Sequence, residues 1–238
     1  MGSGIYIATA GAVAQDRALD VAANNIANAS TSGYKAKRAT FGQELARTRS
    51  ADAAFAGVAD IATDNTAGPI RATDNPLDVA IQGEGYFAVN SPNGVRYTRA
   101  GDFRLDAQGR LVTSTGLAAR GAGGTEIRIP PEAGEVSIQG DGRVMAGADQ
   151  VGQLELARFA PASLAREGDN LYAATAAPLA GGPPVELLSG ALEGANLNVV
   201  RGMVDLVKVS RTYDSLMKMI QGYRDIDAAA ARGLGKPK

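Results

Sequence analysis

Three aspartates in the middle of the chain have the type and spacing that acid–base chemistry needs. Asp102 and Asp106 lie on either side of a short strand-like run, and Asp141 lies in a turn-like segment further on. Paired carboxylates can act as general acid and base in hydrolysis. Each of these residues, however, lies where an aspartate commonly bonds to the backbone of its own turn. We therefore expect turns here, and no catalytic residue.

Two glycine-rich segments match nucleotide-binding loops only in part. Gly83 and Gly85 lack the third glycine and the following helix of a dinucleotide site, and residues 121–124 lack the Lys-Ser/Thr of a phosphate loop. The chain also has no histidine and no cysteine, which removes the commonest general base, thiol catalysis and the usual zinc ligands. No cofactor and no metal site are expected.

Composition excludes further classes of partner. The net charge of the 238 residues is −1, whereas proteins that bind nucleic acid or anionic membranes carry a basic face. No apolar run approaches the ~20 residues that span a bilayer, so direct membrane insertion is not expected. Gly4–Ala14 is apolar like a signal peptide, but no Lys or Arg precedes it. We expect a mature helix there and no cleaved signal.

The C-terminal segment Ala191–Arg232 is the longest part of the chain without proline and is predicted to be helical. Its apolar residues recur at alternating steps of four and three, with Ser210 as the one polar step, which is the spacing of a heptad seam. The seam residues are Val199, Met203, Leu206, Tyr213, Met217 and Ile220. A second apolar shoulder makes this face wider than one partner helix needs, and Asn196 or Asn198 can cap the helix.

The N-terminal segment from Ile5 to about Asn28 is the only comparable helix. Its residues also step by three and four, with Gln15 as the polar member: Ile5, Ala8, Ala12, Leu19, Ala22 and Ile26. The small alanines allow a second helix to approach closely. We predict that the two terminal helices pack together as a coiled-coil-like pair and carry the rest of the chain as an insert.

Between the helices, short apolar runs broken by turns predict a compact antiparallel all-β domain. Two of its hairpins repeat one pattern, in which Gly109-Arg110 and Gly142-Arg143 follow a hydrophobic residue at the same distance. Before this domain, basic Lys35–Ser50 and acidic Ala51–Ala80 suggest charged strips that face each other between neighbouring subunits. The predicted fold is thus α+β: an N-terminal helix and turn (1–33), an extended linker (34–75), the β domain (76–190) and a C-terminal helix (191–238).

Three motifs resemble those of the flagellar rod and hook protein family. The first runs from Asn25 to Lys35 and has the form Asn-Ile-Ala-Asn-x-x-Thr-x-Gly-Tyr-Lys. The second is Tyr97-Thr98-Arg99-x-Gly101-x-Phe103, and the third begins Leu192-Glu193-x-x-Asn196 and leads into the heptad helix. They occur in the family's order and span nearly the whole chain. Together they are specific, although none would be alone.

The resemblance implies a structural subunit of the bacterial flagellar basal-body rod, located in the periplasm. Its implied partners are copies of itself, other rod proteins and the flagellar type III export apparatus, and its implied task is to form a hollow shaft that transmits torque. The modest length is most like the proximal-rod member of the family, with the distal-rod member or another rod or hook subunit as the alternative. A secreted β-domain enzyme or glycan-binding protein is the alternative from a different class.

The predicted assembly interface combines the motif residues with the helix seams. Its members are Ile5, Ala12, Leu19, Asn25, Ile26, Asn28, Thr31, Gly33, Tyr34, Leu192, Glu193, Asn196, Val199, Met203, Leu206, Tyr213, Met217 and Ile220. Gly33 is predicted to take φ > 0 and to direct Tyr34 onto a neighbouring subunit. Because the termini are expected to order only on assembly, proteolysis should trim Met1 to about Ala72 and much of Gly190–Lys238, and leave the β domain. A Gly33 substitution should then leave the soluble fold unchanged.

Overall fold

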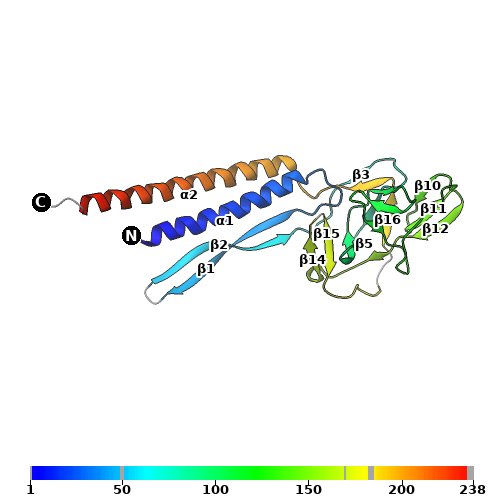
Figure 1. Cartoon of the computed structure of the whole chain (residues 1–238), viewed down its shortest axis with the longest axis horizontal. Coiled ribbons are helices and arrows are strands. Elements are labelled where there is room, and N and C mark those ends of the chain that lie inside the picture. Colours follow the sequence, from blue (N-terminus) through cyan, green and yellow to red (C-terminus); the bar gives the residue numbers. More distant parts are fainter. Residues whose placement is uncertain (1, 49–50, 169, 182–184, 235–238) are drawn as a thin grey trace. The chain divides into compact units, whose positions relative to one another are not determined.

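A computed structural model describes residues 2–48, 51–168, 170–181 and 185–234. Helix α1 (Gly2–Ala27) opens the chain, helix α2 (Val199–Leu234) closes it, and antiparallel strands lie between them (Figure 1). This is the predicted α+β class. The chain divides into two compact units, each discontinuous in sequence. One comprises Met1–Ala27, Ala36–Asp64 and Leu197–Lys238, and the other comprises Asn28–Lys35 and Asn65–Asn196.

In the first unit, α1 and α2 pack against each other in antiparallel directions. Gly4 lies opposite Tyr223 and Gly11 opposite Leu216, while Gly202 lies opposite Ile26 near the start of α2. A Cβ atom at Gly4 would come within 2.8 Å of the Tyr223 hydroxyl oxygen. Glycines and the buried Ala8 and Ala12 therefore permit the close approach that the sequence suggested.

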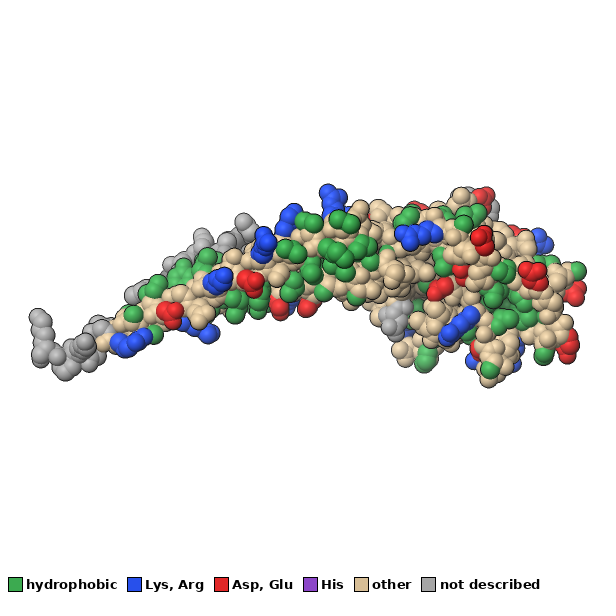
Figure 2. Space-filling view, turned by 90° about the horizontal axis from the view of Figure 1, so that it is seen from above, with side chains coloured by type: hydrophobic (Ala, Val, Ile, Leu, Met, Phe, Trp, Pro, Cys, Tyr) green, Lys and Arg blue, Asp and Glu red, His purple; other side chains and the backbone are tan. Residues whose placement is uncertain are grey.

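The seam of α2 differs in part from the prediction. Ile220 is buried and Leu206 and Tyr213 are half-buried, but Val199, Met203 and Met217 are exposed. Gly202 and Leu216 face α1 instead, each one residue before an expected seam position. The apolar face of α2 is wider than α1 can cover, so the sequence pattern alone could not choose between adjacent positions. Hydrophobic side chains consequently remain visible along the helical part of the molecule (Figure 2).

The expected linker is instead largely a β-hairpin. Strands β1 (Lys37–Thr48) and β2 (Ala51–Thr63) pair antiparallel along their length, with a register shift between Thr40 and Phe41. The hairpin contacts α1, and the side-chain amide of Asn25 both donates to and accepts from the Lys37 backbone at 2.8 and 2.9 Å. These strands contain many alanines and charged residues without alternation of large apolar side chains, so the pattern does not predict strands there.

Parts of the basic and acidic strips lie opposite each other in the hairpin, because Lys37–Thr48 pairs antiparallel with Ala51–Thr63. Next to its described base Arg38 forms an ion pair with Asp64 at 2.6 Å, and the rest of the acidic strip lies beyond β2. That the strips face each other between neighbouring subunits stays a prediction. The α1 face next to the hairpin has its own buried stripe of Ala14, Ala18 and Val21. Helix α1 therefore uses two faces, one for α2 and one for the hairpin.

The second unit consists of antiparallel sheets. The largest has the order β14-β15-β6-β5-β9-β8-β7, with β13 added to β5. Its strands are β5 (Tyr86–Ser91), β6 (Gly94–Thr98), β7 (Phe103–Leu105), β8 (Leu111–Thr113), β9 (Ala118–Ala119), β13 (Leu156–Ala157), β14 (Leu164–Glu167) and β15 (Leu171–Ala174). A three-stranded sheet contains β10 (Val136–Ile138), β11 (Arg143–Ala146) and β12 (Asp149–Gln153). Two pairs join β16 (Glu186–Ser189) to β4 (Val79–Gln82) and β17 (Ala191–Glu193) to β3 (Ile70–Ala72).

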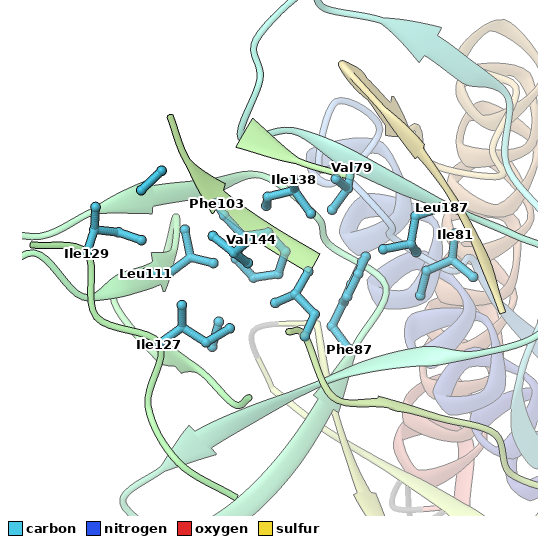
Figure 3. Close-up of a cluster of buried hydrophobic side chains, with 13 residues drawn as sticks. Val79, Ile81, Phe87, Phe103, Leu111, Ile127, Ile129, Ile138, Val144 and Leu187 are labelled. Carbon is cyan, nitrogen blue, oxygen red and sulfur yellow. The ribbon is translucent and has the colours of Figure 1, made fainter. Parts of the chain in front are cut away.

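A hydrophobic core fills the second unit. Phe87 and Phe103 meet edge to face at 5.2 Å, and aliphatic residues from several sheets surround them (Figure 3). Ile127 and Ile129 belong to this core, and Arg128 between them forms an isolated bridge with Arg110. A smaller aromatic cluster holds Tyr86, Tyr97, Phe159 and Tyr172.

The two repeated hairpins form as the sequence predicts. Gly109 and Gly142 have φ of 71° and 83°, and each donates its N–H to a carbonyl three residues earlier. Some strands are not predicted by the apolar pattern because they are short or carry few large apolar residues. β9 and β12 are examples. The last helix begins at Val199 rather than near Ala191, because residues 191–193 form β17.

Candidate functional site: a junction of three motifs

The first motif forms a turn directly after α1. The Thr31 N–H donates to the Asn28 carbonyl at 3.1 Å, and the Thr31 hydroxyl lies 3.3 Å from the Asn28 side-chain oxygen. Gly33 has φ of +65°, which confirms the predicted left-handed conformation. Its N–H donates to the backbone carbonyl of Glu193 at 2.7 Å, so the first motif is joined to the third.

Gly33 is also required by a close approach of two backbones. A Cβ atom at this position would lie 2.4 Å from the Arg99 carbonyl carbon and 2.6 Å from the Ala100 nitrogen. Backbone atoms cannot move aside as a flexible side chain can. The turn of the first motif therefore packs directly on the second motif, and only glycine fits there.

Tyr34 packs inside the chain. It is 2% exposed, and the Arg166 guanidinium lies over its ring at 4.6 Å. Burial raises the pKa of its hydroxyl, while the positive charge of Arg166 acts in the opposite direction. The prediction that Tyr34 faces a neighbouring subunit is therefore wrong. The sequence marked Tyr34 as part of a motif but gave no indication that Arg166, far along the chain, would cover it.

Lys35 and Glu193 form a buried ion pair between the first and third motifs. Lys35 Nζ lies 2.6 Å from Glu193 Oε1, and the two side chains are 1% and 2% exposed. Lys35 also donates to the Thr66 carbonyl at 2.8 Å, and the same Glu193 oxygen accepts the Gly68 N–H at 2.9 Å. Burying two charges is favourable only when they are paired and further hydrogen-bonded, as they are here.

Arg99 of the second motif completes this group of charges. Its guanidinium lies 3.4 Å from Glu193 Oε2, donates to the Gly83 carbonyl at 2.6 Å and lies 5.4 Å from the centre of the Tyr86 ring. Each motif thus supplies one charged side chain. We call Lys35, Arg99 and Glu193, with the backbone that they contact, the motif junction.

Other residues of the second motif hold the surrounding strands. The Thr98 hydroxyl donates to the Asn170 carbonyl and accepts the Ala100 N–H. A Cβ atom on Gly101 would lie 1.8 Å from the Val79 carbonyl oxygen, so this glycine allows another close backbone contact. Phe103 enters the main core. The motif is therefore a packing element as well as the source of a charge.

The two asparagines of the third motif have separate tasks. Asn196 donates from its side chain to the Thr66 carbonyl at 3.1 Å. Asn198 caps α2, because its side-chain oxygen accepts the Arg201 N–H at 3.0 Å. Leu192 is half-buried in β17. The sequence left the choice of cap open between Asn196 and Asn198, and the structure assigns it to Asn198.

Two of the three candidate acid–base residues, Asp106 and Asp141, serve turns as expected. Asp102 differs: it lies in an isolated bridge with Asp78, and its Oδ1 atom is buried without a hydrogen-bond partner among the described residues. Asp106 accepts the backbone N–H groups of Gln108 and Arg110 and pairs with the Arg110 guanidinium at 2.7 Å. Partial desolvation acts to raise the pKa of Asp106, but the Arg110 bonds outweigh it and lower the pKa. For Asp141, the backbone N–H of Arg143 is the main cause of a lowered pKa. Both carboxylates are therefore held ionised by turn hydrogen bonds.

Two other features are absent from the part of the chain that the structure describes. Those residues contain no group of three or more side chains suited to hold a metal ion. Among the described helices, none combines the length and the hydropathy needed to span a membrane. The motif junction is the arrangement that brings together the most residues singled out by the sequence.

The predicted interface residues separate into two groups. Asn25, Gly33, Tyr34 and Glu193 are buried within their own unit, so they act inside the chain. On the helices, Ala12 and Ile220 are buried, and Ile5, Leu19, Ile26, Leu206 and Tyr213 are partly covered. Val199, Met203 and Met217 remain exposed. Sequence reasoning missed Thr66, Arg166 and Asn170, which lie outside the motifs and have no local signal.

Three protein-family models match the chain. They are described as the flagella basal body rod protein (residues 5–35), the flagellar hook protein FlgE/F/G D1 domain (80–146) and the flagellar basal body rod FlgEFG protein C-terminal region (188–232). Their ranges include the three motifs. The matched ranges therefore contain Lys35, Arg99 and Glu193 of the motif junction.

Curated relatives match over nearly the whole chain. The flagellar basal-body rod protein FlgF of Caulobacter vibrioides is 35% identical over 247 residues, which cover 99% of each chain. FlgF of Mesorhizobium japonicum is 29% identical, again with 99% of each chain covered. The flagellar basal-body rod protein FlgG of Agrobacterium fabrum is 35% identical over 264 residues, with 97% of this chain and 98% of the relative covered.

Proposed function

The chain belongs to the flagellar basal-body rod protein family and is a FlgF-like structural subunit of that rod, and we propose that it occupies the proximal rod. Full-length similarity to FlgF proteins supports this position. The distal-rod protein FlgG is the second candidate, because a FlgG relative has the same percentage identity. The proposed subunit forms a hollow shaft in the periplasm, transmits torque and catalyses no reaction.

The exposed apolar face of α2 carries this proposal. Val200 is 73% exposed, and four further exposed apolar residues lie on the same side of the first turns of α2: Val199, Met203, Val204 and Val207. A contiguous exposed apolar surface of this kind marks a binding surface in a protein that must stay in solution. The occupant that we propose is a helix of a neighbouring rod subunit, either a copy of this chain or another rod protein.

A groove beside α2 supports helix-to-helix assembly. It has a volume of about 230 Å³, and its walls come from both helices: Thr9, Ala12, Val13, Asp16, Tyr213, Met217, Ile220 and Arg224. Ala12 and Ile220 belong to the contact between the two helices, whereas Met217 and Val13 are exposed. An apolar side chain of a neighbouring helix would cover those two residues.

The helix pair itself is proposed to be coiled-coil-like. The residues of α2 that are less exposed than their neighbours recur at steps of four and three: Gly202, Leu206, Val209, Tyr213, Leu216, Ile220 and Tyr223. This spacing is the one that keeps a seam facing a partner helix. We also propose export of the chain by the flagellar type III apparatus, which the family resemblance implies.

A charge on the exposed face tests the proposed function. In cells that lack the native gene, Val200→Asp should prevent rod completion and swimming, because it places a carboxylate in an apolar contact. The purified variant should keep the helix content of the unmodified protein. Thr212→Asp, which adds the same charge at an exposed position of α2 outside the apolar face, is the control and should support swimming. Normal rods with Val200→Asp would exclude this face as the assembly surface.

A further inference from the structure

Four polar side-chain atoms near the motif junction are buried without a hydrogen-bond partner among the described residues. They are Arg99 Nε, Asn170 Oδ1, Tyr172 Oη and Glu193 Oε2. Each of these side chains belongs to a residue that is at least nine-tenths buried. A buried polar atom left unpaired costs stability, and native proteins commonly satisfy such atoms with an internal water.

Contacts in the second unit place Arg99 and Tyr172 against one aromatic ring, that of Tyr86, and join Glu193 to Arg99. The Arg99 guanidinium lies 5.4 Å from the centre of Tyr86, and the Tyr172 ring lies 5.3 Å from the same ring. Arg99 in turn approaches Glu193 Oε2 at 3.4 Å, longer than an ordinary N–H···O hydrogen bond, and that oxygen has no hydrogen-bond partner among the described residues. Arg99, Tyr172 and Glu193 therefore lie in one neighbourhood of the second unit.

Asn170 joins this neighbourhood through its backbone and its amide. Its carbonyl accepts the Thr98 hydroxyl, next to Arg99 in sequence, and its Nδ2 donates to the Ser32 carbonyl at 2.9 Å. Its φ of 61° is unusual for a residue other than glycine, and asparagine tolerates this region better than most. The side-chain oxygen is left without a partner among the described residues.

The hydrogen-bond donors and acceptors among the four atoms indicate which kind of ligand fits. Arg99 Nε–H donates, Glu193 Oε2 and Asn170 Oδ1 accept, and the Tyr172 hydroxyl can donate. An anion would be repelled by the two acceptor oxygens, and a cation would be repelled by Arg99. Water donates two hydrogen bonds and accepts two, which matches the set. We propose that ordered water occupies this part of the second unit and bridges Arg99, Asn170, Tyr172 and Glu193.

This water would join the motifs to one another. Arg99 belongs to the second motif, Glu193 belongs to the third, and Asn170 is bonded to Ser32 in the turn of the first. The motif junction is then completed by solvent as well as by the Lys35–Glu193 ion pair. The inference does not depend on the proposed position in the rod.

Thermal unfolding of the full-length chain at pH 7 tests the bridge. Tyr172→Phe should lower the melting temperature, because the water loses a partner that phenylalanine cannot replace. An unbridged hydroxyl would give the opposite result: its removal would raise the melting temperature or leave it unchanged, and the proposal would be overturned. Tyr97→Phe is the control, because Tyr97 is similarly buried but its hydroxyl is not among the unpaired atoms.

Two further measurements identify the ligand. A crystal structure of the full chain that resolves other internal waters should show water within hydrogen-bonding distance of at least two of the four atoms. Empty density there would overturn the proposal. The melting difference between the unmodified chain and Tyr172→Phe should stay constant as chloride is raised. A difference that grows with chloride would show a bound anion in place of water.

Discussion

Gly33 shows how one residue can be required for two independent reasons. Its φ of +65° disfavours any side chain, and the Arg99 backbone occupies the space where a Cβ would lie. We expected a Gly33 substitution to leave the soluble fold unchanged. That expectation assumed that the turn orders only on assembly and has no contacts within its own chain. The structure favours the opposite outcome, because the turn packs on the second motif in the same chain.

Gly33→Ala should therefore destabilise the purified protein. The left-handed conformation alone costs roughly 1–2 kcal/mol, and the backbone clash adds to that cost. Gly116→Ala is the control, because Gly116 has φ of +87° but no atom within 4 Å of the added Cβ. Urea unfolding should show a clearly larger loss for the Gly33 variant than for the Gly116 variant. Equal losses would mean that the close approach to Arg99 is absent in solution.

Removing one partner of the Lys35–Glu193 pair should be costly. Lys35→Met leaves the Glu193 carboxylate buried with the Gly68 N–H and a longer Arg99 contact but without its lysine, and breaking a buried pair in this way typically costs about 3–5 kcal/mol. Lys208→Met removes an exposed lysine with a weak pair at 3.9 Å and should change stability by less than about 0.5 kcal/mol. Denaturant unfolding of both variants measures the difference. A small loss for Lys35→Met would contradict the buried pair.

Alkaline pH should weaken the second unit through Tyr172. Burial raises its pKa to about 12, above the ordinary value of 10.0. The neutral hydroxyl is thus favoured in the folded state, so its contribution is complete below pH 10 and is lost as the pH rises from 10 towards 12. Two pKa units correspond to roughly 2–3 kcal/mol. Melting curves from pH 8 to 11.5 should fall less steeply for Tyr172→Phe than for the unmodified chain.

At the scale of elements, α2 shows what periodicity can and cannot decide. The sequence identified both terminal helices and several core strands because their apolar residues recur at regular steps. It could not choose between Met217 and Leu216 as a partner of α1, since both lie on one wide apolar face. The β1–β2 hairpin was missed because its alanine-rich strands have no such period.

Charges placed on two neighbouring α2 positions should have different effects. Ile220 is 7% exposed within the helix pair, whereas Met217 is 44% exposed. Ile220→Asp buries an unpaired carboxylate and should cost several kcal/mol, which opens the helix pair in the purified chain. Met217→Asp should leave the monomer folded and impair only assembly. Hydrogen exchange of α1 amides distinguishes the two, and fast exchange in Met217→Asp would contradict the assigned seam.

At the scale of the whole molecule, the family motifs could be identified in the sequence. Their contacts with one another in the folded chain could not be predicted from it. Lys35 and Glu193 are 158 positions apart, and their pairing depends on strands β3 and β17, which carry weak local signals. Buried partners such as Thr66 and Asn170 are ordinary residues in a sequence. Only the folded chain shows that they satisfy the charges and backbone groups of the motifs.

The structure also changes what limited proteolysis should leave. The sequence-based expectation was a fragment that starts near Ala72, but Asn28–Lys35 is part of the same compact unit as the β strands. After cleavage in the first unit, the peptide that contains Lys35 should stay bound to the β fragment under native conditions. Gel filtration followed by mass spectrometry detects it. Its loss at an early stage of digestion would show that the first motif is only loosely held.

The ion pair between Lys35 and Glu193 has a consequence for the order of events during synthesis. A ribosome delivers Lys35 and Arg99 long before Glu193, so a nascent chain has two cations and no carboxylate with which to bury them. The second unit can fold only after Glu193 has been synthesised, so a chain that stops before this residue cannot form the native β unit. Chains stalled before residue 190 should therefore be cut rapidly by a protease at Lys35, whereas released chains of full length should resist cleavage there.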